Sequence, residues 1–176
     1  MGRRVVRRWP GGPRVVLTGP RLFVAVFPSE EARDHLRRHL PAHAARSPDK
    51  WHVTLAFLGD VPEEPVVEAL ATVPGPGPVR LHLAGSGRFG SVLWAGLLGD
   101  LEPLTAFRER VRVALTEAGF PIDGRPFHPH LTISYRFDRR VVAALADYAG
   151  PSWEVDEFSL VSSADGEYHR LWAGPL

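Results

Sequence analysis

The sequence contains no cysteine. This excludes a disulfide scaffold, thiolate zinc sites, iron–sulfur clusters and a cysteine nucleophile. It also has no apolar run approaching the roughly 20 residues that a membrane helix needs, so no membrane association is expected. The basic N-terminus is interrupted by Pro and Gly at 10–13, and no long apolar segment follows. We therefore expect no secretory signal and a cytoplasmic protein.

Acidic residues are absent from residues 1–21, which carry six arginines. The remaining residues hold 15 basic and 20 acidic side chains, a net charge of −5. Proteins that coat nucleic acids carry a basic surplus, and residues 22–176 do not. Any phosphate must therefore be bound by a few residues at one local site. We predict a flexible basic leader over 1–20, followed over 21–176 by one domain or two small lobes that share one core.

Hydrophobic patterns alternate between strand and helix periods along the body. Strands are expected at 22–27, 51–58, 79–83, 92–97, 130–135, 153–162 and 168–173. Helices are expected at 29–40, 62–71, 101–118 and 139–148. This order predicts an α+β protein with mainly antiparallel sheets. No Gly-rich phosphate loop, GxSxG, HExxH or calcium-loop pattern is present.

One short motif occurs twice, each time in a predicted strand. Residues 52–55 read His-Val-Thr-Leu, and residues 130–133 read His-Leu-Thr-Ile. Alternate side chains of a strand share a face, with ~7 Å between them. Each HxTx tetrad therefore presents an imidazole and a hydroxyl on one face and buries its apolar partners. The four polar side chains are His52, Thr54, His130 and Thr132.

Two such strands brought together would place two imidazoles and two hydroxyls in one groove. An imidazole has an ordinary pKa of about 6.5, so one can accept a proton while the other donates one. Threonine hydroxyls suit the non-bridging oxygens of a phosphate. The pattern predicts metal-free cleavage of a phosphodiester. The alternative is a structural role, in which the Thr54 and Thr132 hydroxyls form hydrogen bonds with backbone groups, because β-branched residues are common in strands.

Other histidines and the aromatic residues are weaker candidates. His128 and His130 form an incomplete metal shell, so we expect no metal and place His128 in a loop beside the cleft. Phe127 and Tyr135 flank the second tetrad and could stack on a base, although aromatic residues more often pack in cores.

With these motifs in hand, the chain resembles the RNA 2′,3′-cyclic phosphodiesterases, also called 2′-5′ RNA ligases, of the two-histidine phosphoesterase superfamily. The resemblance covers roughly residues 21–173. Its markers are residues 21–26, 52–59, 92–97, 127–133 and 162–171.

The resemblance implies a bilobal, pseudo-symmetric fold of antiparallel sheets and flanking helices around a central cleft. It implies hydrolysis of a 2′,3′-cyclic phosphate to a 2′-phosphomonoester, with no metal or cofactor, His52 donating a proton and His130 accepting one. The family often has Arg where this chain has Tyr135. Arg136 follows, and it would share the His130 face if the strand stays regular, as a candidate phosphate anchor.

The resemblance implies as partners RNA ends or nucleotides that carry a 2′,3′-cyclic phosphate, and we expect a monomer. Three alternatives remain at this point. One is the reverse reaction, which joins RNA ends through a 2′-5′ linkage. Another is an RNA-end-binding module without turnover, which the presence of both histidines disfavours. The third is hydrolysis of another small cyclic phosphodiester, such as a nucleotide-sugar cyclic phosphate.

Overall fold

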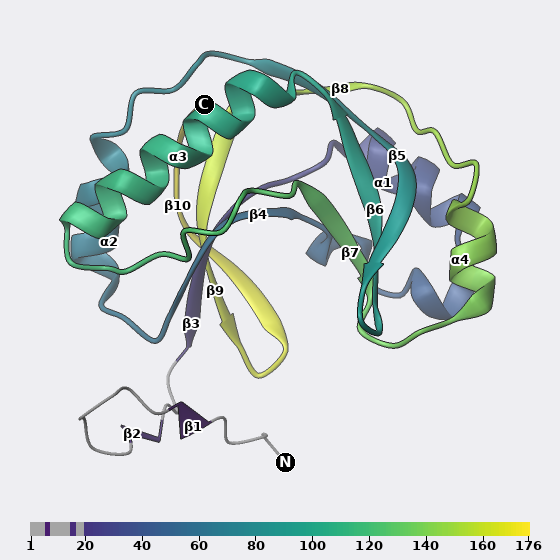
Figure 1. Ribbon diagram of the computed structural model, residues 1–176, viewed down its shortest axis with the longest axis horizontal. Coiled ribbons are helices and arrows are strands. Elements are labelled where there is room, and N and C mark those ends of the chain that lie inside the picture. The colour runs from purple at the N-terminus through teal and green to yellow at the C-terminus, as the bar shows by residue number, and fades with distance from the viewer. Residues whose placement is uncertain (1–5, 8–14, 17–19) are drawn as a thin grey trace.

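A computed structural model describes residues 6–7, 15–16 and 20–176 (Figure 1). Strands β1 (Val6–Arg7) and β2 (Val15–Val16) pair antiparallel. The flexible leader predicted for 1–20 otherwise lies outside the described residues, and its flexibility stays a prediction.

The body is built on one curled, antiparallel sheet in the order β10-β9-β3-β4-β7-β6-β5-β8. Its strands are β3 (Arg21–Val26), β4 (Val53–Gly59), β5 (Val79–Phe89), β6 (Val92–Gly99), β7 (His130–Ser134), β8 (Trp153–Val155), β9 (Glu157–Ala164) and β10 (Glu167–Pro175). Two four-stranded halves meet at β4 and β7, where Val53 pairs with Leu131. The expected α+β class and antiparallel pairing are confirmed, although the halves form one continuous sheet.

Four helices cover the sheet in two pairs (Figure 1). They are α1 (Glu30–His39), α2 (Glu63–Ala71), α3 (Leu101–Glu117) and α4 (Arg139–Leu145). The chain runs β3-α1-β4-α2 and later β6-α3-β7-α4, so the order strand–helix–strand–helix occurs twice. The helix α2 packs against α3, and α1 lies on the side of α4, where His35 of α1 contacts the hydroxyl of Tyr148 just after α4. Each pair therefore takes one helix from each repeat, which gives the fold its pseudo-symmetry.

Local signals explain the helices. Ser29 caps α1 by accepting a hydrogen bond from the Ala32 amide, and acidic residues fill the first turn while basic residues fill the last. In α3, apolar side chains at helical spacing are completely buried: Leu104, Phe107, Val111 and Leu115. Phe107 packs edge-to-face on Phe158 of β9 at 4.8 Å between ring centroids. The main core thus joins α3, a helix of the second repeat, to β9, a strand of the half-sheet that contains β3 and β4.

Several predicted strands differ from the structure in extent. β5 runs to Phe89 instead of ending at residue 83. The single strand predicted over 153–162 is two strands, because the chain leaves one half-sheet at Asp156; β8 pairs with β5, and β9 pairs with β3 and β10. The tetrad strands are slightly shorter than predicted, since β4 begins one residue after His52 and β7 ends at Ser134.

Two 3₁₀ turns, Ala42–Ala44 and Pro48–Lys50, shape the segment between α1 and β4. No helix in the described ranges is long and apolar enough to cross a membrane.

Candidate active site

The two tetrads meet where the half-sheets join. The antiparallel register that pairs Val53 with Leu131 sets His52 across from Thr132 and Thr54 across from His130. Residues directly opposite each other in such a pair point to the same face. Val53 and Leu131 are buried on the other face. The four polar side chains of the tetrads therefore line one face of the central seam, as the sequence predicts.

Both histidines are held in the same way by nearby backbone. The Nδ1 atom of His52 lies 2.7 Å from the carbonyl oxygen of Lys50, and that of His130 lies 2.7 Å from the carbonyl oxygen of His128. A carbonyl oxygen can only accept a hydrogen bond, so each Nδ1 carries a proton and donates it. Each Nε2 is then the nitrogen left to exchange a proton with a ligand.

The environment of His52 is largely aromatic. Its ring centroid lies 4.7 Å from Phe23, 5.5 Å from Tyr168 and 5.9 Å from Phe27. Burial lowers the pKa of His52 below its ordinary value; the bond to the Lys50 carbonyl raises this pKa, and the like charge of His130 lowers it. The two imidazoles thus lie close enough to influence each other, and free His52 favours the neutral form at neutral pH.

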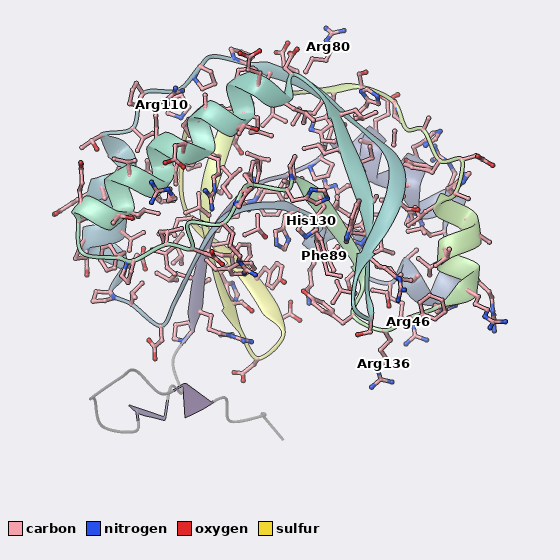
Figure 2. All side chains as sticks on the ribbon, viewed as in Figure 1. Arg46, Arg80, Phe89, Arg110, His130 and Arg136 are labelled. Carbon is pink, nitrogen blue, oxygen red and sulfur yellow. The ribbon has the colours of Figure 1, made fainter. Side chains whose placement is uncertain are left out.

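His130 has its own aromatic surroundings, on the inner side of β5, β6 and β7 (Figure 2). Its ring centroid lies 5.1 Å from Phe89 and 5.9 Å from Trp94. Trp94 crosses close over Gly87, where a Cβ atom would come within 2.1 Å of the indole. His128 lies in the loop before β7, as predicted, and packs edge-to-face on Trp94.

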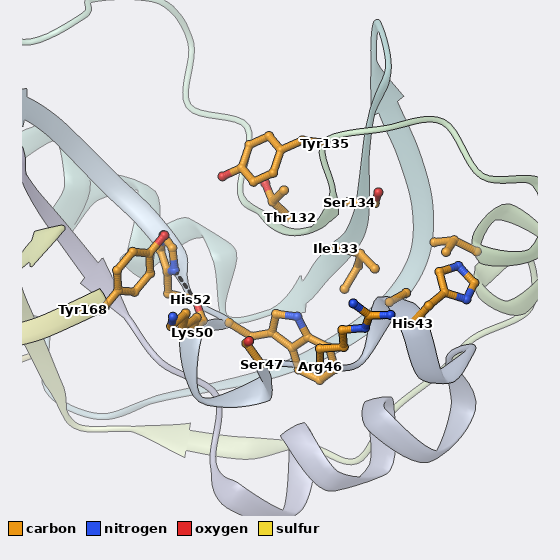
Figure 3. A pocket seen from close by; sticks show the side chains of 13 residues that line it. His43, Arg46, Ser47, Lys50, His52, Thr132, Ile133, Ser134, Tyr135 and Tyr168 are labelled. Atoms are coloured by element: carbon orange, nitrogen blue, oxygen red, sulfur yellow. Dashed lines mark hydrogen bonds between the residues drawn. The ribbon is translucent and has the colours of Figure 1, made fainter. Parts of the chain in front are cut away.

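A pocket of about 310 Å³ adjoins His52 and Thr132 (Figure 3). Its other walls come from the loop before β4, the end of β7, α4 and β10. The polar or aromatic residues that line it are His43, Arg46, Ser47, Lys50, Trp51, His52, Thr132, Ser134, Tyr135 and Tyr168. No carboxylate is among the described residues that line it.

The remaining predicted site residues lie in different surroundings. Thr54 is half-buried across from His130 and does not line this pocket. Tyr135 lies at the pocket edge with 73% of its surface exposed. Phe127 packs against the main core, with the Arg108 guanidinium 5.6 Å from its ring centroid.

The expectation for Arg136 is wrong. It assumed that the strand stays regular to residue 136, but β7 ends at Ser134. The Ser134 hydroxyl donates a hydrogen bond to the Arg136 carbonyl oxygen and accepts one from the Arg136 backbone N–H. These two bonds hold a turn in the chain. The Arg136 side chain points outward, away from His130 (Figure 2).

Sequence reasoning missed the basic residues of the pocket. Arg46 and Lys50 come from the segment between α1 and β4, and nothing in its local pattern indicates which residues face a cleft. The Lys50 ammonium donates to the Gly166 carbonyl at 2.5 Å and pairs with Glu167 at 3.2 Å. His43 bonds Asp138, the N-cap residue of α4, at 2.5 Å.

The described part of the chain contains no group of three or more His, Cys, Asp or Glu side chains that could hold a metal ion.

Comparison with known proteins gives a consistent match. The sequence model of a family described as the 2′-5′ RNA ligase superfamily matches residues 25–167. The RNA 2′,3′-cyclic phosphodiesterase of Escherichia coli (strain K12) is 31% identical over 155 residues, which cover 82% of this chain and 87% of that protein. The protein of the same name from Thermus thermophilus is 34% identical over 164 residues, 81% of each chain. The one from Geobacillus stearothermophilus is 36% identical, but the chain spans only 41% of its length.

Solved structures agree with these matches. The crystal structure of E. coli LigT complexed with 3′-AMP superposes with a TM-score of 0.72 at 27% identity, covering 90% of this chain and 98% of that one. The crystal structure of a Thermus thermophilus protein, TT0787, gives a TM-score of 0.65 at 29% identity, covering 89% of this chain and 97% of that one.

Proposed function

The chain belongs to the 2′-5′ RNA ligase superfamily, and on that basis we propose that it hydrolyses 2′,3′-cyclic phosphates of RNA ends or nucleotides to 2′-phosphomonoesters. The observation that carries the proposal is the matched anchoring of two histidines on one face. Each donates its Nδ1 proton to a backbone carbonyl, and no described residue forms a hydrogen bond with its Nε2. Such a pair is suited to combined acid and base catalysis.

In the proposed reaction, Nε2 of neutral His130 accepts a proton from water as the water oxygen bonds to phosphorus. Nε2 of protonated His52 donates its proton to the 3′-oxygen as the bond between phosphorus and that oxygen breaks. The phosphate stays on the 2′-oxygen, and the two histidines exchange protonation states. Proton return through solvent resets the site. No step requires a metal ion or a cofactor.

Neighbouring side chains support this reaction. Thr54 and Thr132 lie on the histidine face and can donate their hydroxyl protons to the non-bridging oxygens of the phosphate. Tyr135, exposed at the pocket edge, offers a face for stacking by the terminal base. Both histidines come from one chain, so the reaction needs no second copy, in keeping with the expected monomer. The cytoplasmic location expected from the sequence stays a prediction.

The role of His52 is compatible with its lowered pKa. A protonated imidazole with a low pKa is a stronger acid and gives up its proton more readily. In the free protein the protonated form is scarce at neutral pH, but a bound phosphate anion raises the pKa of a nearby imidazole. Binding of the substrate would therefore help to charge the acid.

The direct test is a product assay on adenosine 2′,3′-cyclic phosphate and on an RNA with a 2′,3′-cyclic end, both in EDTA. We expect 2′-phosphate products, separated from the 3′ isomers by chromatography, and turnover lowered by about 10²–10⁴ in a His52→Ala, His130→Ala double variant. Absence of turnover by the intact chain, or 3′-phosphate products, would refute the proposal. Activity that is lost in chelator and restored by a divalent ion would refute its metal-free part.

The family description favours a second candidate, the joining of RNA ends through a 2′-5′ linkage. The same acid and base serve both directions by microscopic reversibility. Water is abundant, so hydrolysis should dominate. Adding an RNA with a free 5′-hydroxyl to the product assay reveals any ligated strand.

A further inference from the structure

Among the cationic side chains that line the pocket beside His52, Arg46 differs from its neighbours because no described residue neutralises its charge. The Lys50 ammonium is bound by Gly166 and Glu167, and His43 is bound by Asp138. Arg46 lines the same pocket, and within the described residues it has neither a hydrogen-bond partner nor an ion-pair partner. Figure 3 shows its guanidinium directed into the pocket.

The surroundings of Arg46 select for a negative charge. The described pocket lining holds two cationic side chains and no carboxylate, although residues 22–176 carry a net charge of −5. The Ser47 hydroxyl lines the same wall and is a further donor. A guanidinium presents a planar fork of N–H donors that matches phosphate oxygens. A pocket of about 310 Å³ is also larger than one phosphate group requires, so it has room for part of a nucleotide.

We propose that Arg46 and its pocket form a subsite for a phosphate attached to the 5′-oxygen of the terminal ribose. This inference rests on the proposed function, which places the cyclic phosphate between His52 and His130. The next charged group of such a substrate is the phosphate on the 5′ side of the same ribose. The subsite makes the preferred substrate an RNA 3′ end or a 5′-phosphorylated nucleotide, in preference to a nucleoside cyclic phosphate without a 5′-phosphate.

The test compares four substrates with the same reacting group. They are adenosine 2′,3′-cyclic phosphate, its 5′-phosphorylated form, a dinucleotide with a 2′,3′-cyclic end, and that dinucleotide with a neutral methylphosphonate linkage. For the intact chain we expect kcat/KM to rise about tenfold when a 5′ anion is present, mainly through KM, because Arg46 is exposed enough for water to screen the contact. A gain with both anionic substrates assigns the subsite to any 5′-phosphate, and a gain with the dinucleotide alone assigns it to a phosphodiester.

The variant Arg46→Gln should remove that gain and leave the two substrates without a 5′ anion unchanged. Arg38→Gln, at an exposed arginine of α1, is the matched control for loss of one positive charge and should retain the gain. On the dinucleotide, Arg46→Gln should also reduce the slope of log kcat/KM against log salt by about 0.7, the amount expected for one single-strand phosphate contact.

The failures of the two proposals are distinguishable. If the intact chain turns over none of the four substrates, the proposed function fails. If it turns over all four with equal kcat/KM, or if Arg46→Gln lowers turnover of all four equally, hydrolysis stands and the subsite is refuted.

Discussion

At the scale of single residues, the orientation of each histidine is fixed within its own stretch of chain. His52 and His130 each donate Nδ1–H to the carbonyl two residues upstream. The side chain is therefore aligned before a substrate binds, and its alignment needs no partner from another strand. Preorganisation of this kind lowers the entropic cost of reaching the transition state.

The division of roles between the histidines can be tested by substitution. His52→Ala and His130→Ala should each lower kcat on a 2′,3′-cyclic phosphate by about 10²–10⁴, the usual contribution of a positioned acid or base. The double variant should be far from additive, since the two act as a unit. Steady-state kinetics, with circular dichroism to check folding, measures both effects.

A substrate with an activated leaving group extends this test because its departure needs no proton donor. On it, His52→Ala should recover much of its lost rate, and His130→Ala should not. The reverse pattern would exchange the roles of acid and base. Near-full activity of either single variant on the natural leaving group would contradict the two-histidine mechanism.

The lowered pKa of His52 also predicts a pH dependence of stability. In the unfolded chain this imidazole titrates near its ordinary pKa of about 6.5. In the folded protein burial lowers the pKa. As pH falls below about 6.5, the unfolded state therefore takes up the proton first, and the free energy of unfolding decreases.

In His52→Gln that decrease should be smaller. Urea unfolding at a series of pH values measures it, and NMR titration of the His52 ring gives the pKa directly. His169→Gln, at an exposed position of β10, controls for the loss of one imidazole. A His52 ring that titrates at or above about pH 6.5 in the free protein would contradict the prediction.

At the scale of elements, the seam between β4 and β7 joins the two half-sheets and carries the site. Leu131 pairs with Val53 there and also with Ala95 of β6, and all three are buried. The buried face of the seam thus supports the histidine face directly behind it. Packing at this point connects the stability of the sheet to the geometry of the site.

Leu131→Ala should lower the free energy of unfolding by about 2–5 kcal/mol, because a fully buried leucine leaves a cavity in a packed core. It should also lower kcat, since His130 and Thr132 flank the cavity. Val142→Ala, at a partly exposed position of α4, is the control and should change stability by less than about 0.5 kcal/mol. Urea unfolding measures both. A loss below about 1 kcal/mol for Leu131→Ala would contradict the packing argument.

At the scale of the whole molecule, residues 22–176 carry a net charge of −5, and the pocket concentrates positive charge at one place. Few phosphates of a bound RNA would then contact cations. We expect log kcat/KM for a short RNA with a cyclic end to fall with log salt at a slope of about −0.7, as for the one single-strand phosphate contact proposed at Arg46. Kinetics between low and moderate salt measures the slope. A slope of about −5 would indicate an extended basic surface and contradict this view.

Features that depend on neighbouring residues could be predicted from the amino-acid sequence alone. Ser29 and the acidic residues after it place the start of α1, and the spacing of Leu104, Phe107 and Val111 gives α3 its buried face. The alternation in each tetrad places histidine and threonine on one face. These signals are local because helix and strand periods act over a few residues.

The contacts between these helices, strands and loops follow from the three-dimensional fold. They could not be predicted from local sequence patterns. The strand expected over 153–162 is divided between the two half-sheets, because pairing with β5 and with β3 involves residues far away in sequence. Arg136 turns outward because a serine hydroxyl two residues earlier bonds its backbone where β7 ends. Arg46 enters the pocket because two 3₁₀ turns fold its loop toward the end of β7. Such outcomes depend on where strands end and which distant segments they contact, which the period of a sequence pattern does not encode.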